Sequence, residues 1–400
     1  MNVLWVTPYK PDGRGGAGVS SELELLRVMT RDHDVTLLTS DLPAGTFELD
    51  VGDRTIPISG VDWEPRREVQ SRLAFASQFL RAYPSHEHWF YGARVGALRA
   101  AIQERAARAR FDLVHFTSME MASLVAACDA PSVLLAFDVF SRQSARELEL
   151  TTTRARKLRW SVEHRRMVHW ERRWLPRFGG VATVSSVEAA AIRELTGVVA
   201  EVIPTPLPDK YFEPPTVDRS ATTVTLVANL QYAPNVDAVE WLTAEIWPHV
   251  VEAVPNAALE VVGAHPAPAV VAAVERAHGS LFANVDDVRP HYWRAAVAVA
   301  PIRRGSGLRN KVLHAMACRA PLVATSTALE GIDAVDGQHL LVADDTEGFA
   351  TAIVDALRDR AAAVQRASAA SGLLDGYRSE IVSERFEAWW ARAASSATRK

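Results

Sequence analysis

The chain of 400 residues is long enough for two domains, because a single domain usually spans about 100–200 residues. Apolar residues make up 48% and charged residues 23%, which excludes a largely disordered chain. Lysine and arginine total 44 against 48 for aspartate and glutamate, and the formal net charge of -4 argues against a polycationic nucleic-acid binder.

Cysteine content and hydropathy favour an intracellular protein. The only cysteines, Cys128 and Cys318, are too few for a disulfide framework or a cysteine-based zinc site. The first residues lack the basic and long apolar segments of a secretory signal, and no run of about 18 apolar residues occurs. We therefore expect a cytoplasmic protein that does not span a membrane.

The first half of the chain alternates predicted strands and helices. A strand over residues 3–7 precedes a loop rich in glycine and proline, a helix with an apolar stripe over 20–30, and a strand over 34–40. This order predicts a right-handed crossover and a parallel sheet. Further apolar runs predict buried strands at 113–116, 133–137 and 181–184.

A proline-rich segment separates the two halves. Residues 204–215 carry five prolines, which cannot continue a helix or a central strand, so the segment reads as a linker. We expect an N-terminal domain over residues 1–205, a C-terminal domain over 206–375, and a final segment over 376–400. An amphipathic helix over 380–394, with Phe386, Trp389 and Trp390, is predicted to pack back toward the N-terminal domain.

The second half repeats the alternation of strands and helices. Strands are predicted at 223–227, 258–262, 297–301 and 322–325, and a long helix is predicted at 236–254. Both halves therefore read as doubly wound α/β domains, in which ligands bind beyond the carboxyl ends of the strands.

The first glycine-rich loop leaves three interpretations open. Gly13, Gly15, Gly16 and Gly18 fit the pattern G-x-G-x-x-G between a strand and a helix, as in a dinucleotide site. The segment from Pro8 to residue 12 makes the loop longer than that fingerprint allows. A flexible surface loop is the second interpretation. The third is a loop that closes over a nucleotide-sugar, where glycine permits close approach of the backbone.

The second glycine-rich loop follows the strand predicted at 297–301. Gly305, Ser306 and Gly307 turn the chain into a helix, whose free N–H groups and partial positive charge favour an anion. Four cations surround this turn: Arg303, Arg304, Arg309 and Lys311. The pattern predicts a diphosphate site, and a solvated basic turn is the alternative.

The residues of this loop carry a family resemblance. The stretch from Gly305 through Arg309 and Lys311 to Ala317, followed by Glu330 and Gly331, resembles the group 1 (family 4) glycosyltransferases. Other segments extend the resemblance along nearly the whole chain: the opening loop with Pro8, the strand at 111–115, the segments at 184–186, 203–204, 261–263, 285–288 and 321–325, and a P-N-V-D signature at 234–237.

The chain departs from this family at several positions. The usual pair of donor-binding carboxylates, E-x7-E, corresponds to Ser306 and His314. The first of the pair typically contacts the donor sugar and the second the ribose diol. The family's arginine after the first strand of the C-terminal domain is replaced by Ala228-Asn229, and a His-Asp pair after the fourth strand reads Phe137-Asp138.

The resemblance implies two facing Rossmann-like domains, the GT-B architecture. It implies retaining transfer of a sugar from a nucleoside diphosphate-sugar, held by the C-terminal domain, to an acceptor hydroxyl or amine, held by the N-terminal domain. It implies a natural-product or cell-surface glycan as product, and neither a metal nor another cofactor, in a bacterial-type enzyme. The residues expected to act in catalysis are His115, Arg309 and Lys311. Those expected to bind the donor are Gly15, Gly16, Arg303, Gly305, Ser306, Gly307, His314 and Glu330.

Two other functions remain as alternatives. A catalytically inactive relative, acting as a nucleotide- or glycan-binding partner subunit, is suggested by Ser306 and His314. A nicotinamide oxidoreductase depends on residues 13–18 alone.

The stretch over residues 142–177 is basic, with ten arginines and one lysine against four glutamates. Its helical part at 154–177 also contains Trp160, Trp170 and Trp174. Such a helix suits peripheral contact with an anionic membrane at its inner face. A solvated helix of the acceptor domain is the other interpretation.

Overall fold

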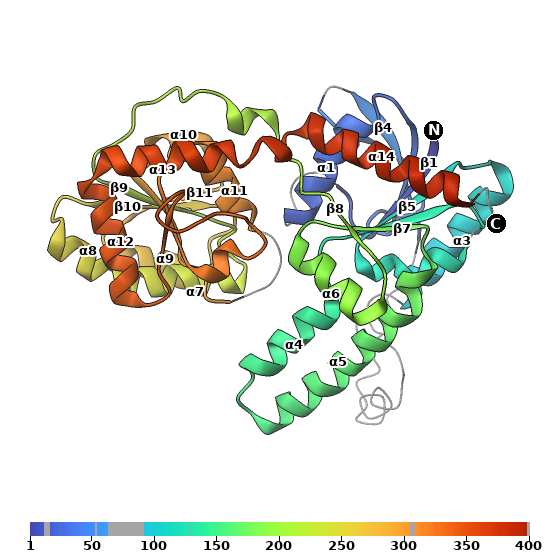
Figure 1. Cartoon of the computed structure of the whole chain (residues 1–400), viewed down its shortest axis with the longest axis horizontal. Helices are drawn as coiled ribbons and strands as arrows, with labels where there is room; N and C mark the ends of the chain where they lie inside the picture. Colours follow the sequence, from blue (N-terminus) through green and yellow to red (C-terminus); the bar gives the residue numbers. More distant parts are fainter. Residues whose placement is uncertain (12–16, 53, 63–91, 128, 305–308, 398–400) are drawn as a thin grey trace. The chain divides into compact units, whose positions relative to one another are not determined.

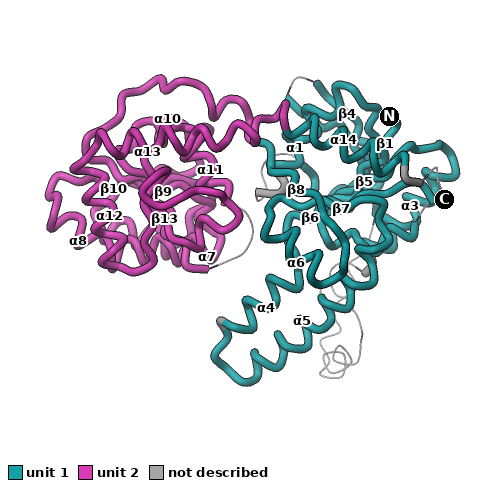
Figure 2. Tube along the Cα trace, in the orientation of Figure 1, with its two compact units in different colours: residues 1–206, 382–400 teal, residues 207–381 magenta. Residues whose placement is uncertain are grey.

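The chain divides into two compact units in the computed structural model (Figure 2). The structure describes residues 1–400 except 12–16, 53, 63–91, 128, 305–308 and 398–400. Unit 1 consists of residues 1–206 and 382–400, and unit 2 of residues 207–381. Unit 1 is therefore built from two separate stretches of the chain.

Unit 1 is built around one eight-stranded sheet, with the strand order β3-β4-β2-β1-β5-β6-β7-β8. All neighbouring strands are parallel except β3 and β4, which pair antiparallel at the edge. The strands are β1 Asn2–Thr7, β2 Asp34–Thr39, β3 Gly45–Asp50, β4 Thr55–Gly60, β5 Leu113–Thr117, β6 Ser132–Ala136, β7 Gly180–Thr183 and β8 Glu201–Val202.

Helices cover both faces of this sheet, and each face buries its own apolar cluster. One cluster joins the strands to α1 (Ala17–Met29) and α14 (Ser379–Ala397). The other joins them to α3 (Gly92–Arg108), a 3-10 segment at Met119–Ala127, α5 (Arg154–Trp174) and α6 (Ser186–Thr196). Because both faces are buried, the central strands are apolar at nearly every position.

Helix α14 belongs almost wholly to unit 1, although it follows unit 2 in sequence. Phe386, Trp389 and Trp390 are at most 1% exposed and lie on the sheet beside Trp5. Gly180 of β7 permits this approach, because a Cβ atom there would lie 2.6 Å from Nε1 of Trp389. The helix thus closes one face of the first sheet.

Helices α4 (Phe140–Leu150) and α5 form a hairpin that extends from the sheet of unit 1 (Figure 1). The exposed residues 152–159 of this hairpin include Arg154, Arg156, Lys157 and Arg159. Trp170 and Trp174 lie at the other end of α5 and are buried in the core of unit 1. Two of the three tryptophans expected on a membrane-facing surface are therefore core residues, because this end of α5 packs on the sheet.

Unit 2 is built around a six-stranded parallel sheet with the order β11-β10-β9-β12-β13-β14. Numbered from the first strand of this unit, the order is 3-2-1-4-5-6, that of the Rossmann fold. The strands are β9 Thr223–Val227, β10 Ala258–Gly263, β11 Ser280–Ala283, β12 Val297–Ala300, β13 Leu322–Ala324 and β14 Leu341–Val342.

Two groups of helices cover the faces of the second sheet. One face packs on α7 (Ala233–Trp241), α8 (Trp247–Ala253), α9 (Pro268–Arg276) and α12 (Thr346–Arg358). The other packs on α10 (Arg289–Arg294), α11 (Asn310–Ala317) and the end of α13 (Arg360–Gly372). The prediction of an α/β protein with two doubly wound domains is confirmed.

One predicted helix contains a turn of a different helical type. The helix expected over 236–254 consists of α7, a π-helical turn at Leu242–Ile246, and α8. Pro248 lies in the first turn of α8 and has no N–H to donate to the preceding turn. The predicted helix is therefore confirmed as one continuous helical stretch over 233–253, with a π-helical turn that the apolar pattern did not predict.

Candidate functional site

The topological switch point of unit 2 lies between β9 and β12, the neighbours at which the strand order reverses. In parallel sheets of this kind the ligand crevice opens beyond the carboxyl ends of these two strands. The loop after β9 leads to α7, and the loop after β12 leads to α11. These two loops and helices carry most of the described residues predicted to bind a donor.

Lys311 is brought to this edge by α11. The helix buries Val312, Leu313 and Met316 against the sheet, which leaves Lys311 half-buried. The ammonium Nζ of Lys311 donates a hydrogen bond to Oδ1 of Asn235 on α7. The two helices that follow the switch-point strands are therefore joined by a lysine and an asparagine.

The charge of Lys311 is easily changed near neutral pH. Burial, and next the neighbouring Arg309 guanidinium, lower the pKa of Lys311 to about 7. Both causes act against the ammonium form, so an incoming anion would relieve the cost of charging this side chain.

Asn235 is held in place by its own contacts. The side chain is 5% exposed, and its Nδ2 donates to the carbonyl of Asn229 at 2.7 Å. Asn229 follows β9 closely, so Asn235 ties the strand end to the first turn of α7. The approach of this loop to β10 needs Gly263, since a Cβ there would lie 1.7 Å from the carbonyl oxygen of Ala228.

Arg303, a predicted donor-binding residue, is engaged by acidic and aromatic partners. Its Nη2 and Nε atoms donate to the two carboxylate oxygens of Asp237 at 2.9 and 3.1 Å. Its guanidinium also lies 4.8 Å from the ring centroid of Trp241. Both partners belong to α7, like the partner of Lys311.

Arg309 and Glu330 lie in the described part of unit 2, the first at the start of α11 and the second beyond β13. Arg309 immediately precedes α11, is half-buried, and is close enough to Lys311 to shift its pKa. Glu330 follows a 3-10 turn at Ser326–Leu329 beyond β13 and is half-buried. The other donor-binding predictions in the two glycine-rich loops lie outside the described residues: Gly15, Gly16, Gly305, Ser306 and Gly307.

His314 lies one turn further along α11 and stacks on an aromatic ring from the linker. Its imidazole is parallel to the ring of Tyr211, with centroids 4.1 Å apart and an interplanar angle of 7°. Burial, and next the charge of Lys210, lower the pKa of His314 to about 4. The position at which the resemblance predicts a carboxylate therefore holds a neutral imidazole, and one of its faces is covered by Tyr211.

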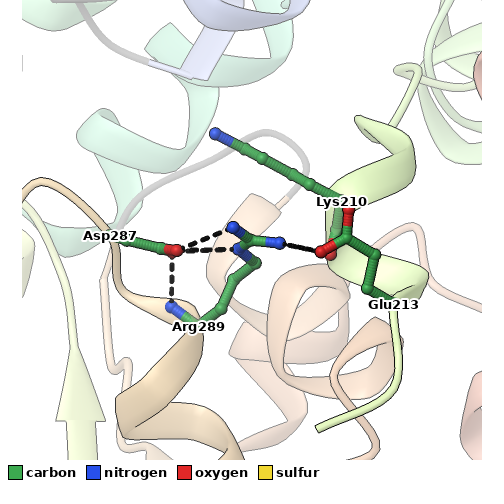
Figure 3. A network of polar contacts seen from close by, with 4 residues as sticks. All are labelled: Lys210, Glu213, Asp287 and Arg289. Carbon is green, nitrogen blue, oxygen red and sulfur yellow. Dashed lines mark hydrogen bonds and ion pairs between the residues drawn. The ribbon is translucent and has the colours of Figure 1, made fainter. Parts of the chain in front are cut away.

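The linker is fixed beside α10 by a second polar network (Figure 3). Arg289 donates to Asp287, to Glu213 at 2.5 Å and to the carbonyl of Lys210 at 3.0 Å. Partial burial raises the pKa of Asp287, but the hydrogen bonds from Arg289 outweigh it and leave the pKa lowered. The carboxylate of Asp287 is therefore satisfied within the fold.

His115, the first predicted catalytic residue, lies in the middle of β5 in unit 1 and is 0% exposed. The centroid of its ring lies 4.1 Å from that of Trp5, and its Nδ1 accepts a hydrogen bond of 3.2 Å from Nε1 of Trp390 on α14. Burial lowers the pKa of His115 to about 3. The side chain faces α14, so the structure places this predicted catalytic residue in the core of unit 1 as a neutral imidazole.

Unit 1 holds a buried carboxyl group at its own switch point that the sequence did not reveal. Glu22 of α1 is 1% exposed and accepts hydrogen bonds from Trp5 at 2.7 Å and Thr7 at 2.8 Å. Burial raises the pKa of Glu22 to about 7 against the opposing effect of these hydrogen bonds. Its position gave no signal, since a glutamate on a helix usually reads as a solvated residue.

Neither a metal cluster nor a membrane span is found in the part of the chain that the structure describes. There, no three histidine, cysteine, aspartate or glutamate side chains come together as metal ligands would. Among those same residues, no helix has both the length and the apolar character to cross a bilayer.

Comparison with known proteins finds a family model that matches part of unit 2. Residues 221–359 match the family model described as glycosyl transferases group 1, and this range contains β9, α7, β12 and α11. The match lies entirely within unit 2. No curated protein matches the sequence.

Solved structures match the fold over nearly the whole chain. A sucrose-phosphate synthase from Thermosynechococcus elongatus has a TM-score of 0.72 at 14% identity, covering 99% of this chain and 100% of its own. A UDP-forming α,α-trehalose-phosphate synthase from Burkholderia xenovorans, solved with glucose-6-phosphate, has a TM-score of 0.66 at 12% identity, covering 98% and 100%. The Anabaena protein HepE, solved with UDP and glucose, has a TM-score of 0.63 at 13% identity, covering 97% and 98%. At these identities the likeness establishes the fold, which is that of GT-B proteins.

Proposed function

We propose that the protein is a glycosyltransferase that takes its sugar from a nucleoside diphosphate-sugar bound at the switch point of unit 2. The observation that carries this proposal is Lys311, a lysine held by Asn235 beyond the carboxyl ends of β9 and β12. The same residues lie within the range that matches the group 1 glycosyl transferases. Structural neighbours of this chain include a protein solved with UDP and glucose, and a UDP-forming synthase.

The reaction that we propose proceeds with retention at the anomeric carbon. The bond from that carbon to the β-phosphate oxygen breaks while the acceptor oxygen or nitrogen bonds on the same face. The proton of the acceptor passes to the departing phosphate oxygen, so this route needs no protein base. The protein's task is to stabilise the growing negative charge, and we assign it to Lys311 and Arg309.

We also propose that transfer needs no metal ion, because cationic side chains replace it at the diphosphate. The acceptor is a hydroxyl or amine compound of a natural-product or cell-surface glycan pathway, and unit 1 is the unit that we propose binds it. An inactive relative that only binds nucleotides or glycans is the competing proposal, motivated by His314 in place of a carboxylate.

Thermal unfolding with a panel of ligands tests the donor site. UDP, GDP, ADP, TDP and NAD are compared with no ligand, each at high excess. A ligand at about 100 times its Kd stabilises the folded protein by about 2.7 kcal/mol. We expect one nucleoside diphosphate to raise the midpoint, and NAD to leave it unchanged. A shift with NAD alone would favour the oxidoreductase, and no shift at all would contradict the donor site.

Transfer or hydrolysis of the sugar nucleotide then separates the enzyme from an inactive relative. Release of the nucleoside diphosphate is measured for the wild type, Lys311→Met and Lys157→Met. Lys157 is an exposed lysine of α5 and carries the same substitution as a control. We expect release by the wild type and Lys157→Met only. A wild type that binds the nucleotide but never releases it from the sugar, with any acceptor, would support the inactive relative.

Peripheral contact of the stretch 154–177 with an anionic membrane, through its exposed start at 154–159, is a separate proposal. Four basic residues are exposed near the start of α5, and Leu158 among them is 64% exposed. Sedimentation with vesicles of neutral lipid, with and without anionic lipid, tests it. We expect binding only to anionic vesicles and its loss at high salt. Equal binding to both, or to neither, would exclude this contact.

A further inference from the structure

The two cations at the switch point of unit 2 are both held by α7, but by partners of different charge. Lys311 donates to the amide oxygen of Asn235, and Arg303 donates to the carboxylate of Asp237. Asn235 and Asp237 are two residues apart, within the P-N-V-D segment at 234–237. Two residues from one turn of α7 therefore supply the hydrogen-bond partners of both side chains.

The carboxylate partner leaves Arg303 little net charge with which to attract an anion. Asp237 receives hydrogen bonds from two nitrogens of the guanidinium, at 2.9 and 3.1 Å, and cancels its charge. The guanidinium also packs on Trp241 at 4.8 Å. Binding a diphosphate through Arg303 would mean competing with a bidentate ion pair that the fold already makes.

The amide partner has the opposite effect on Lys311. Because Nδ2 of Asn235 donates to the carbonyl of Asn229, its Oδ1 atom faces Lys311. The amide thus fixes the position of the ammonium without supplying a negative charge. An ammonium has three donors, and within the described chain the contact with Asn235 is the hydrogen bond made by Nζ, which leaves two for a ligand.

We propose that Asn235 is a positioning residue that presents Lys311 to the donor diphosphate without neutralising it, whereas Asp237 commits Arg303 to the fold. This assignment rests on the function proposed above and deepens it. Of the two predicted cations, Lys311 binds the ligand and Arg303 stabilises the loop after β12. The identity of the residue at 235, an amide and not an acid, then determines donor affinity.

The substitution Asn235→Asp tests this directly, because it changes charge with almost no change in shape. The new carboxylate would pair with Lys311 and compete with the diphosphate. We expect UDP, or whichever diphosphate stabilises the wild type, to bind at least about tenfold more weakly, since a charge-assisted hydrogen bond contributes about 1.5–3 kcal/mol. Because a carboxylate cannot donate to the carbonyl of Asn229, we expect the thermal midpoint without ligand to fall, and circular dichroism checks that the variant is folded.

Asp237→Asn and Arg303→Met are the matched controls on the second pair. Both alter the Arg303 contact and leave the Lys311 contact intact. We expect diphosphate affinity within about threefold of the wild type for Arg303→Met, and affinity equal to or higher than that of the wild type for Asp237→Asn, which no longer cancels the charge of Arg303. Equal binding by Asn235→Asp and the wild type would overturn the proposal. So would a loss of affinity in Arg303→Met as large as that in Asn235→Asp.

A second measurement reports on the contact itself and does not depend on a ligand. The rate at which acetic anhydride modifies Lys311 is followed by mass spectrometry at about pH 8, relative to exposed Lys157. We expect Lys311 to react more slowly in Asn235→Asp, because a neighbouring carboxylate favours the protonated lysine, and only the neutral amine reacts with the anhydride. An unchanged rate would show that residue 235 does not govern Lys311. A changed rate, with no diphosphate bound by the wild type, would refute the proposed donor site and leave the positioning contact standing.

Discussion

The charge state of Lys311 leads to a quantitative prediction about diphosphate affinity. Burial and the Arg309 guanidinium lower the pKa of Lys311 to about 7, so the side chain loses its proton as the pH rises through neutrality. The protonated fraction falls from about 0.9 at pH 6 to about 0.1 at pH 8. If the ammonium form alone binds the diphosphate, the affinity contributed by Lys311 falls about tenfold over this interval.

Calorimetric titration of UDP into the wild type and Lys311→Met at pH 6, 7 and 8 measures this contribution. The ligand's own phosphate also titrates in this range and gains negative charge as the pH rises. Lys311→Met experiences only that effect, so the ratio of the two affinities isolates the lysine. We expect this ratio to be largest at pH 6, at about 10–100, and to fall about tenfold by pH 8.

Two results would refute the reasoning about Lys311. A ratio that stays constant from pH 6 to pH 8 would mean that the lysine does not change its charge in this range. A ratio of about one at pH 6 would mean that it makes no contact with the diphosphate. Circular dichroism of Lys311→Met, and the Lys157→Met variant, control for loss of the fold. If another nucleoside diphosphate stabilises the protein better, it replaces UDP in the same design.

Four further predictions concern stability and metal dependence. Trp390→Ala should cost about 3–5 kcal/mol of unfolding free energy in denaturant titration, because the side chain is 0% exposed, whereas a loss below about 1 kcal/mol would contradict the packing of α14. His314→Ala should lower the thermal midpoint more than His314→Phe, which keeps the stack on Tyr211; equal losses would argue against that stack. Burial raises the pKa of Glu22 to about 7 in the folded protein, so the unfolding free energy that its protonated form contributes is lost as the pH rises from about 4.5 to 7. Glu22→Gln should remove this decrease when the unfolding free energy is measured at several pH values. An unchanged decrease would contradict the prediction. EDTA should leave sugar transfer unchanged, and a strict requirement for Mg²⁺ would contradict metal-independent transfer.

The fold was accessible from the sequence because the central strands are buried on both faces. The runs predicted at 223–227 and 113–116 coincide with β9 and β5 to within one residue. The strand β3 was missed, since five of its six residues are exposed and its apolar pattern is weak. A pattern that depends on burial cannot reveal an edge hairpin that buries little.

Only part of the candidate site could be predicted from the sequence: its cations could, and their hydrogen-bond partners could not. Lys311 and Arg303 were visible as cations after a buried strand, but their partners Asn235 and Asp237 lie 76 and 66 residues earlier. Local spacing carries no information about which helices a parallel sheet brings together. The sequence also could not distinguish a cation that is free for a ligand from one that an acid neutralises.

His115 shows why a polar residue in an apolar strand is ambiguous. Its place on β5 was predicted, but the face on which it lies was not. That face is covered by α14, whose Trp390 comes 275 residues later in the chain and donates to the imidazole. Whether His115 is a surface residue or a core residue therefore depends on the position of α14, which the residues around His115 do not reveal.

The composition of unit 1 from two stretches of chain has a consequence for biosynthesis. Residues 1–206 are made first, yet the helix that covers one face of their sheet arrives only with residues 382–397, after all of unit 2. Until then Trp5 and its neighbours have no cover from α14. During translation unit 2 can complete its own core while one face of the sheet in unit 1 still lacks α14. The unit that is synthesised first should therefore be the last to reach its native packing.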